Sequence, residues 1–393
     1  MKKNLFILAL AAAFFAACSS SDDLGQANWD DESIDLEALN SDVPIKFGVV
    51  NGTAETRATV QSEELKANGI GVFMLARMKR STWSPNWLSD NVVNRRLNIW
   101  LDNVEANIVY EDAVHLSKFE WTDKKQQHFY PSLQRYSYEF IGYYPRTDNI
   151  DYTTMTGTTY QAIYAYIDID GSTDIMYAHA ATPAGKPKAF SSEYYKDEPT
   201  ADPPHFQFSH KLARMQFKVR LTSDAATVGN YYVDSVYLED MSYKTKLQIA
   251  YKGSNQTDGS APINGGQLYS VDASTAKKNF CLKTINDTDI ADENYLLTDE
   301  AQPIGDAIMF FPCNSTLNLR VVIRDDNGSR YSPTNAIPVT PPSGGWQAGV
   351  TYPISIKLTD PVKVHASASL LDYTSYIDLG GAEQEVEDKT QEP

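Results

Sequence analysis

Cysteine and histidine are scarce in this chain: its 393 residues include three of the first and six of the second. No CxxC pair and no Cys/His spacing typical of zinc sites occurs. The sequence also lacks the GxSxG, HExxH and phosphate-loop motifs of common enzyme classes. We therefore expect neither an enzyme nor a bound metal or cofactor.

Basic residues are also few, because 34 Lys and Arg stand against 51 Asp and Glu and give a net charge of −17 at pH 7. Such a charge repels nucleic acid and anionic lipid head groups, so neither is expected as a partner. Beyond residue 17 no apolar stretch approaches the roughly 20 residues that a membrane helix needs. Any membrane contact is expected to go through covalently attached lipid.

The first residues of the chain have the pattern of a lipoprotein export signal. Lys2 and Lys3 precede an apolar run over 5–17 that is too short to span a bilayer, and two small residues stand before Cys18. The pattern predicts a signal peptide over 1–17 and acylation of the Cys18 thiol, with the several acyl chains that stable anchoring needs. A plain secretory peptide that ends by chance at a cysteine is the alternative.

The abundant residues favour β-structure, since 24 residues are tyrosine and 11% are aromatic. The composition therefore predicts an all-β fold. A continuous apolar run over Ile70–Ala76 predicts a strand buried on both faces. Met215, Phe217 and Val219 alternate with polar residues, which is typical of a strand with one buried face.

Short strands separated by turns continue to the end of the chain and predict two β-sandwich domains in series. A loop over 181–204 that is rich in Pro, Lys and Ala marks the expected boundary, with one domain over 58–203 and the other over 204–379. Residues 18–57 are expected to form an acidic spacer and residues 380–393 an acidic tail.

One strand-like run, over 45–50, precedes the first domain, and Ile45, Phe47 and Val49 are its alternate apolar residues. Arg57 follows in a small, polar segment of the kind in which a protease can cut. A plain exposed arginine in a linker is the alternative.

A late extended segment is predicted beyond Pro361. In its longest form it covers residues 362–379. Its alternating apolar positions are Val362, Val364, Ala366, Ala368 and Leu370.

Apart from Cys18 the chain contains only Cys281 and Cys313, which are 32 positions apart in predicted strands. An exported protein meets an oxidising compartment, so these two can form a disulfide. Two separate buried thiols, acting as small hydrophobic residues, are the alternative.

Carboxylates and histidines give weak metal signals. Asp168, Asp170 and Asp174 have some likeness to a calcium loop, but the glycine comes too early and no Glu closes the loop, so a hairpin turn is predicted instead. His205 and His210 are five apart, which places them on opposite faces of a strand. They are expected to be poor joint ligands, with His210 half-buried.

The tryptophans Trp83, Trp87, Trp100 and Trp121 allow two interpretations. Exposed indole rings can stack on sugars, so a glycan-binding surface lipoprotein is an alternative function. Aromatic residues also dominate protein cores, and core packing explains these rings equally well.

Several motifs together resemble the fimbrillin family of Bacteroidetes, the subunits of protease-assembled type V pili. In the family's order the motifs are the leader to Cys18, Ile45-Lys46-Phe47 ahead of Thr56-Arg57-Ala58-Thr59, Ile70-Gly71-Val72-Phe73, the run 138–145, the run 174–178, the run 208–214 and the run 345–352. They cover most of the chain.

The resemblance implies two transthyretin-like β-sandwich domains in tandem, delivered to the outer membrane as a lipoprotein anchored at Cys18. An arginine-specific protease would cut after Arg57 and leave Ala58 as the new N-terminus. The cut would remove the strand over 45–50, and the groove it leaves would take the late strand, within 362–379, of the next subunit.

The partners that the resemblance implies are other fimbrial subunits, through strand exchange, the arginine-specific protease and, before cleavage, outer-membrane lipid. The protein would move from the outer membrane into a surface fimbrium that supports adhesion. Family subunits often stop close to their last strand, whereas this chain continues over 380–393. A stalk role and an accessory or tip role therefore both stay open.

Overall fold

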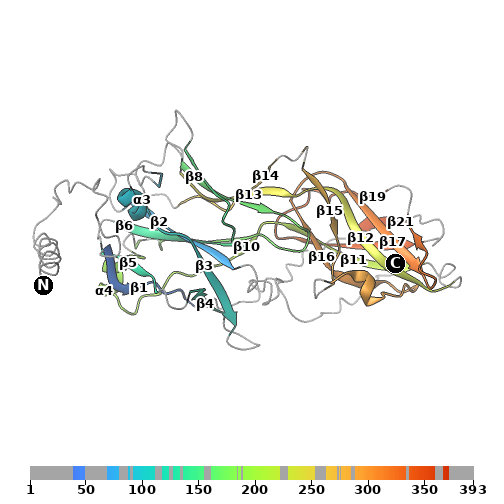
Figure 1. Cartoon of the computed structure of the whole chain (residues 1–393), viewed down its shortest axis with the longest axis horizontal. Helices are drawn as coiled ribbons and strands as arrows, with labels where there is room; N and C mark the ends of the chain where they lie inside the picture. Colours follow the sequence, from blue (N-terminus) through green and yellow to red (C-terminus); the bar gives the residue numbers. More distant parts are fainter. Residues whose placement is uncertain are drawn as a thin grey trace, which may run out of the picture.

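The computed structural model shows a protein built from β-sheets that are arranged along one long axis (Figure 1). It describes residues 39–48, 69–78, 87–88, 92–110, 117–123, 127–132, 136–154, 161–183, 185–186, 189–221, 229–252, 263–271, 274, 276–284, 288–332, 336–358 and 366–370. The predicted all-β class is confirmed. None of the helices in these ranges has the length and apolarity needed to span a membrane.

A six-stranded antiparallel sheet organises the left half of Figure 1. Its strands, in spatial order, are β10 (Ser209–His210), β9 (Met176–Ala180), β6 (Tyr136–Tyr144), β2 (Ile70–Met78), β3 (Ile99–Tyr110) and β4 (Ser117–Trp121). A four-stranded sheet packs on one face, and its strands are β14 (Leu268–Ser270), β13 (Lys244–Lys252), β8 (Gln161–Asp168) and β7 (Ile150–Thr154). The other face is covered by β1 (Asn40–Pro44), β5 (Phe129–Pro131) and α4 (Ser192–Asp197), while α3 (Val92–Asn98) leads into β3.

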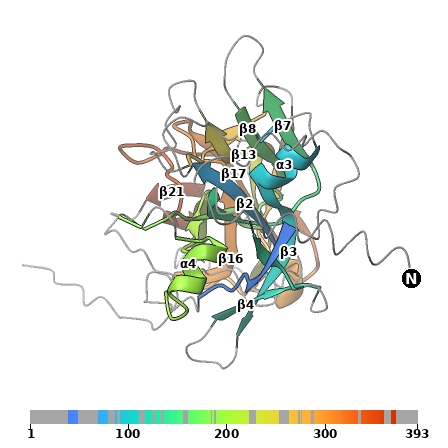
Figure 2. The same cartoon turned by 90° about the vertical axis from the view of Figure 1, so that its left-hand side faces the viewer.

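Strand β2 is buried on both faces, as its apolar run predicts. Phe73 and Leu75 belong to the core shared with the four-stranded sheet. Val72 and Met74 belong to a second core on the opposite face. Figure 2 shows this layering end-on, with β7 and β8 on one side of β2 and α4 on the other. The second core depends on the short elements that cover it.

The right half of Figure 1 consists of two further sheets whose inner faces share one core. One contains, in spatial order, β16 (Gln302–Phe310), β11 (Ala213–Leu221), β20 (Thr351–Leu358) and β21 (Ala366–Leu370). The other contains β15 (Lys277–Cys281), β12 (Tyr231–Ser242), β17 (Leu317–Asp325) and β18 (Arg330–Tyr331), with β19 (Ile337–Val339) paired to β17 and η4 (Ile290–Glu293) beside β12. In β11 buried residues alternate with exposed ones, so the predicted one-sided strand is confirmed.

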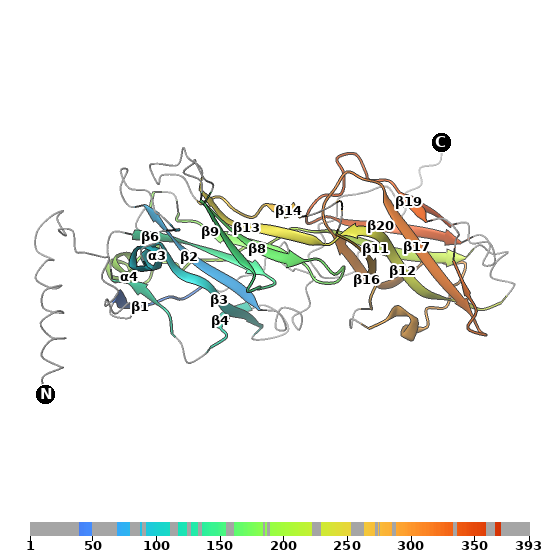
Figure 3. The same ribbon diagram turned by 45° about the horizontal axis from the view of Figure 1, so that its top comes forward.

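The sheets do not separate at the predicted boundary between residues 203 and 204. Strand β10 follows that boundary yet pairs with β9, which precedes it. Strand β13 likewise pairs with β8, from Lys244 opposite Asp168 to Lys252 opposite Gln161. Figure 3 shows β13 and β14 between β9 on one side and β11 and β16 on the other. Strands from both sides of the predicted boundary therefore build the left half.

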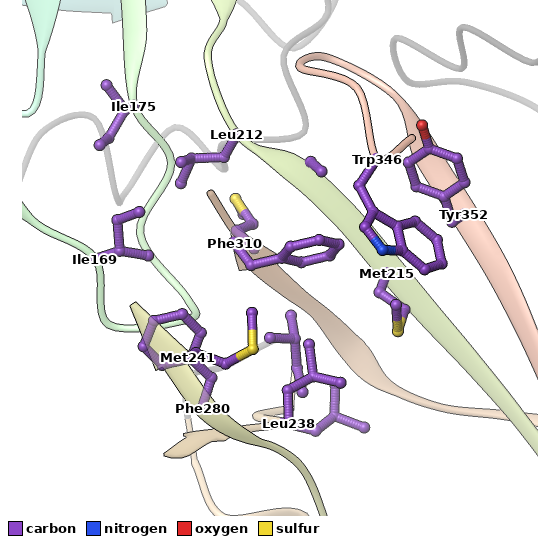
Figure 4. Close-up of a cluster of buried hydrophobic side chains, with 14 of the residues drawn as sticks. Ile169, Ile175, Leu212, Met215, Leu238, Met241, Phe280, Phe310, Trp346 and Tyr352 are labelled. Carbon is purple, nitrogen blue, oxygen red and sulfur yellow. The ribbon is translucent and has the colours of Figure 1, made fainter. Parts of the chain in front are cut away.

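A continuous core joins the two halves of the molecule. Ile169 and Ile175, from the loop between β8 and β9, lie in the same cluster as Leu212 and Phe310 (Figure 4). The backbone N–H of Met309 donates to the carbonyl of Gly171 at 2.8 Å. The loop thus enters the core of the right half and ties it to β8 and β9.

Gly171 makes this close approach feasible. Its φ is +97°, and an added Cβ would lie 2.8 Å from the Cβ of Phe280. We expect Gly171→Ala to lower the free energy of unfolding by about 1–3 kcal/mol through backbone strain and overpacking. Chemical denaturation measures this loss. Gly328→Ala is the matched control, since Gly328 also has positive φ but nothing lies within 4 Å of its added Cβ. Equal losses in both variants would contradict a role for the Phe280 contact.

Candidate assembly groove

Residues 39–48 pack over one face of the six-stranded sheet, and backbone hydrogen bonds join them to β5, His128 and Pro204 beside it. Strand β1 pairs with β5, and the N–H of Ile45 donates to the carbonyl of His128 at 2.8 Å. The N–H of Gly48 donates to the carbonyl of Pro204 at 3.0 Å. The strand ends at Pro44, before the predicted run, so the prediction of a strand beginning at Ile45 is wrong in position. Residues 45–48 are nevertheless held by the two hydrogen bonds to His128 and Pro204.

The Phe47 side chain sits half-buried in a cage of four aromatic rings. Its ring centroid lies 4.6 Å from that of Phe119, 4.9 Å from Phe206, 5.3 Å from Phe140 and 5.5 Å from Trp121. Phe206 stacks on it, and Trp121 and Phe140 meet it edge-on. These are favourable aromatic geometries. We call these four rings the Phe47 cage.

The backbone of Gly48 approaches the His205 ring so closely that a side chain at position 48 would force this ring to move. A Cβ added to Gly48 would lie 2.0 Å from Cε1 of the His205 ring. Ile45, two residues before Phe47, is buried in the same apolar core as the cage. The segment therefore contacts the sheet side by three successive features: the buried Ile45 side chain, the Phe47 ring and the Gly48 backbone.

Helix α4 holds β5, the hydrogen-bonding partner of β1, in place. Ser191 caps the helix by accepting from the N–H of Tyr194, and the Ser192 hydroxyl donates to the carbonyl of Pro131 at 2.7 Å. On the surface Lys196 pairs with Asp42 at 2.6 Å. Exposed ion pairs contribute little stability, so the apolar contacts and backbone bonds hold the segment.

Several predicted site residues lie outside the described residues: Cys18, Val49, Arg57, Ala58, Val362 and Val364. The backbone of Ala366, Ala368 and Leu370 forms β21, which pairs with β20 at the edge of its sheet. In the structure this part of the late segment is thus a strand of its own subunit.

The two downstream cysteines are free thiols. Cys281 is exposed, and Cys313 is partly buried against the core. The structure therefore contains neither the disulfide that was one expectation nor the two buried thiols that were the other.

The predicted hairpin turn at Asp170 is wrong, because the loop around it joins β8 and β9, which belong to different sheets. Asp170 makes its hydrogen bonds within this loop. Its carboxylate accepts from the N–H groups of Ser172 at 2.9 Å and Thr173 at 2.7 Å. Burial opposes ionisation of Asp170, but these hydrogen bonds outweigh it and lower the pKa of the carboxyl. Asp174 instead accepts from His210. Within the described residues, no three His, Cys, Asp or Glu side chains gather where they could hold a metal ion.

The His210–Asp174 pair predicts a dependence of stability on pH. Burial lowers the pKa of His210, and the charge of Arg214 lowers it further. The hydrogen bond to Asp174 and the charge of Asp174 outweigh both effects, so the pKa of His210 is raised above its usual value. A raised folded pKa gives stability that is complete below the unfolded value of about 6.5 and is lost as pH rises through the folded pKa. The midpoint of thermal unfolding should therefore be higher for wild type than for His210→Asn. This difference should be largest at pH 5.5 and smallest at pH 8.5. A difference that does not change with pH would contradict this assignment.

The tryptophans do not form an exposed platform where the structure describes them. Trp87 and Trp100 are buried, and the indole N–H of Trp100 donates to the carbonyl of Phe129 at 2.7 Å. Trp121 is half-buried in the Phe47 cage, and Trp83 lies outside the described residues. Core packing is thus the correct interpretation for Trp87 and Trp100.

In a comparison with known protein families, residues 56–372 match the family described as fimbrillin-like. This range covers well over half of the chain. The chain belongs to the fimbrillin-like family. The predicted resemblance is confirmed, and the family is structural rather than enzymatic. Membership places this fimbrillin-like protein among cell-surface fimbrial proteins and implies other fimbrial subunits as partners.

Solved structures similar to this fimbrillin-like chain include proteins from Bacteroides and Porphyromonas species. One, from Bacteroides uniformis, is described as a cell adhesion protein, with 16% identity, a TM-score of 0.41 and coverage of 78% of this chain and 92% of that one. A fimbrial protein from Bacteroides vulgatus has 13% identity, a TM-score of 0.39 and coverage of 84% and 98%. The fimbrial anchor protein Mfa2 from Porphyromonas gingivalis has 10% identity, a TM-score of 0.27 and coverage of 78% and 83%. No curated protein matches the chain.

Proposed function

We propose that this protein is a structural subunit of a cell-surface fimbria, exported as a lipoprotein on Cys18 and polymerised by strand exchange after cleavage at Arg57. The observation that carries the proposal is the position of residues 39–48, which cover an apolar face of the six-stranded sheet and fill the Phe47 cage. A segment that fills a groove and stands before a cleavable arginine is suited to be a temporary occupant.

Cleavage would act through this cover. Cutting after Arg57 separates residues 18–57 from the folded part, and with them the lipid attached at Cys18. Departure of the segment would free backbone groups of β5, His128 and Pro204 that are now paired with it. Open backbone groups and an uncovered apolar face together form a site that accepts a strand.

The donor is the C-terminal segment of the next subunit, within residues 362–379. Its last described strand, β21 (Ala366–Leu370), lies at the edge of its sheet. Uncut subunits keep their grooves filled and stay monomeric during export. Polymerisation then begins only where the protease acts, at the cell surface.

The proposal is tested by incubating the purified precursor with an arginine-specific protease. We expect Ala58 as the new N-terminus, read by N-terminal sequencing, and a ladder of oligomers on size-exclusion chromatography. The matched control is Arg57→Lys, which keeps the charge but removes the preferred residue, and it should remain uncut at this position and monomeric. A wild-type protein that is cut after Arg57 and remains monomeric would contradict polymerisation by strand exchange.

A further inference from the structure

The groove under residues 45–48 has a defined side-chain requirement. Ile45 fills a buried aliphatic position, and two residues later Phe47 fills the cage. An extended strand places residues i and i+2 on the same face. An occupant that reproduces these contacts must therefore carry an aliphatic side chain and, two residues on, a ring.

A small side chain cannot satisfy the cage. Four rings surround Phe47: Phe119 and Trp121 from β4, Phe140 from β6 and Phe206 from the segment before β10. A valine or alanine in place of Phe47 would leave a cavity bordered by these rings, because packed aromatic walls collapse only partly. The cage thus selects its occupant by size.

The alternating face of the late segment over 362–370 offers only Val, Ala and Leu. The next residues differ: Leu371 and Tyr373 repeat the spacing of Ile45 and Phe47. Strand β21 ends at Leu370 and pairs with β20 along all five of its residues.

We infer that Leu371 and Tyr373 of a second copy of this chain occupy the positions of Ile45 and Phe47 after cleavage. The inference rests on the proposed strand exchange and identifies the side chains that set its register. Residues 371–379 span up to about 30 Å when extended, and a six-stranded sheet with strands about 4.8 Å apart is about 24 Å wide. Strand β21 then remains with its own subunit while the chain beyond it enters the neighbour.

His128 lies beside the cage and could serve as a polar partner for a Tyr373 hydroxyl bound there. The ring of His128 lies 4.6 Å, between centroids, from that of Trp121. Burial, followed by the charge of Arg96, lowers the pKa of His128. The imidazole is therefore neutral at pH 7, and one of its nitrogens can accept a hydrogen bond.

The experiment compares three full-length variants after cleavage with an arginine-specific protease. Tyr373→Ala should raise the protein concentration needed for oligomers by about 100-fold, the cost of losing a buried ring. Tyr373→Phe keeps the ring and should polymerise within about threefold of wild type, since only a hydrogen bond is lost. Tyr376→Ala is the matched control: it lies three residues on, which is the opposite face of an extended strand, and should behave as wild type.

A second measurement does not depend on the folding of any variant. A synthetic peptide of residues 371–379, added during cleavage of wild type, should cap the groove and shorten the oligomers, and the same peptide with Tyr373→Ala should not. If Tyr373→Ala protein polymerises as wild type does, or if both peptides act alike, the inference is wrong while strand exchange stands. If cleaved wild type itself stays monomeric, strand exchange fails and the inference fails with it.

Discussion

Phe47→Ala in the uncleaved precursor is expected to loosen the segment over residues 39–48 and to cost about 2–3 kcal/mol. A fully buried phenylalanine costs about 3–5 kcal/mol when truncated, and the lower figure applies because the Phe47 ring is only half-buried. The loss cannot exceed the free energy that holds residues 39–48 on the sheet. Once the segment has detached, losing the contacts of Phe47 with the cage has no further effect. Local opening is therefore expected before global unfolding.

Hydrogen exchange of the precursor measures this effect. The amides of Ile45 and Gly48, which donate to His128 and Pro204, should exchange about 30- to 150-fold faster in Phe47→Ala, the factor that 2–3 kcal/mol gives. Lys46→Ala is the matched control, since Lys46 is exposed between the buried Ile45 and the half-buried Phe47. Unchanged exchange at both amides would show that the cage does not hold the segment.

Much of the sheet structure follows from local sequence. Strand β2 is predictable because both of its faces are apolar over seven consecutive residues, and β11 because its polar residues fall on every second position. In both cases the order of apolar and polar residues within the strand predicts which of its faces are buried. No contact with a distant part of the chain has to be known.

Strand β3 could not be predicted in the same way. Asn103 has a φ of +53°, and the pairing with β2 shifts register between Val72 and Met74. Such an irregularity interrupts the two-residue alternation on which prediction depends. Asn103 is held by distant groups: its amide donates to the carbonyl of Thr147 at 2.7 Å, and the Tyr143 hydroxyl donates to its side chain at 2.7 Å.

Strand β1 was missed for a different reason. Asp42 and Pro44 are poor strand residues, and proline is accepted here because β1 pairs on one side only, with β5. Phe47 itself stands out from the sequence, but its cage does not. Its walls come from residues between Phe119 and Phe206, so only the folded sheet brings them together.

The largest loss of stability is expected from Glu139, a carboxylate buried in the centre of the six-stranded sheet with no exposed surface. One oxygen lies 3.2 Å from the Arg77 guanidinium. The other lies 2.9 Å from Nε2 of His179 and accepts from the N–H of Ile263 at 2.8 Å. Ile263 precedes β14, so this carboxylate ties the two sheets of the left half together.

Glu139→Ala should lower the free energy of unfolding by about 3–5 kcal/mol, because it breaks a buried ion pair and removes the acceptor of a buried amide. Glu139→Gln keeps the shape and one acceptor, so its loss should be smaller. Chemical denaturation measures both. Asp148→Ala is the control: Asp148 also pairs with an arginine, at 2.7 Å, but its side chain is 85% exposed, and exposed pairs contribute about 1 kcal/mol or less. A loss for Glu139→Ala no larger than that of the control would mean that β14 is held by apolar packing rather than by this carboxylate.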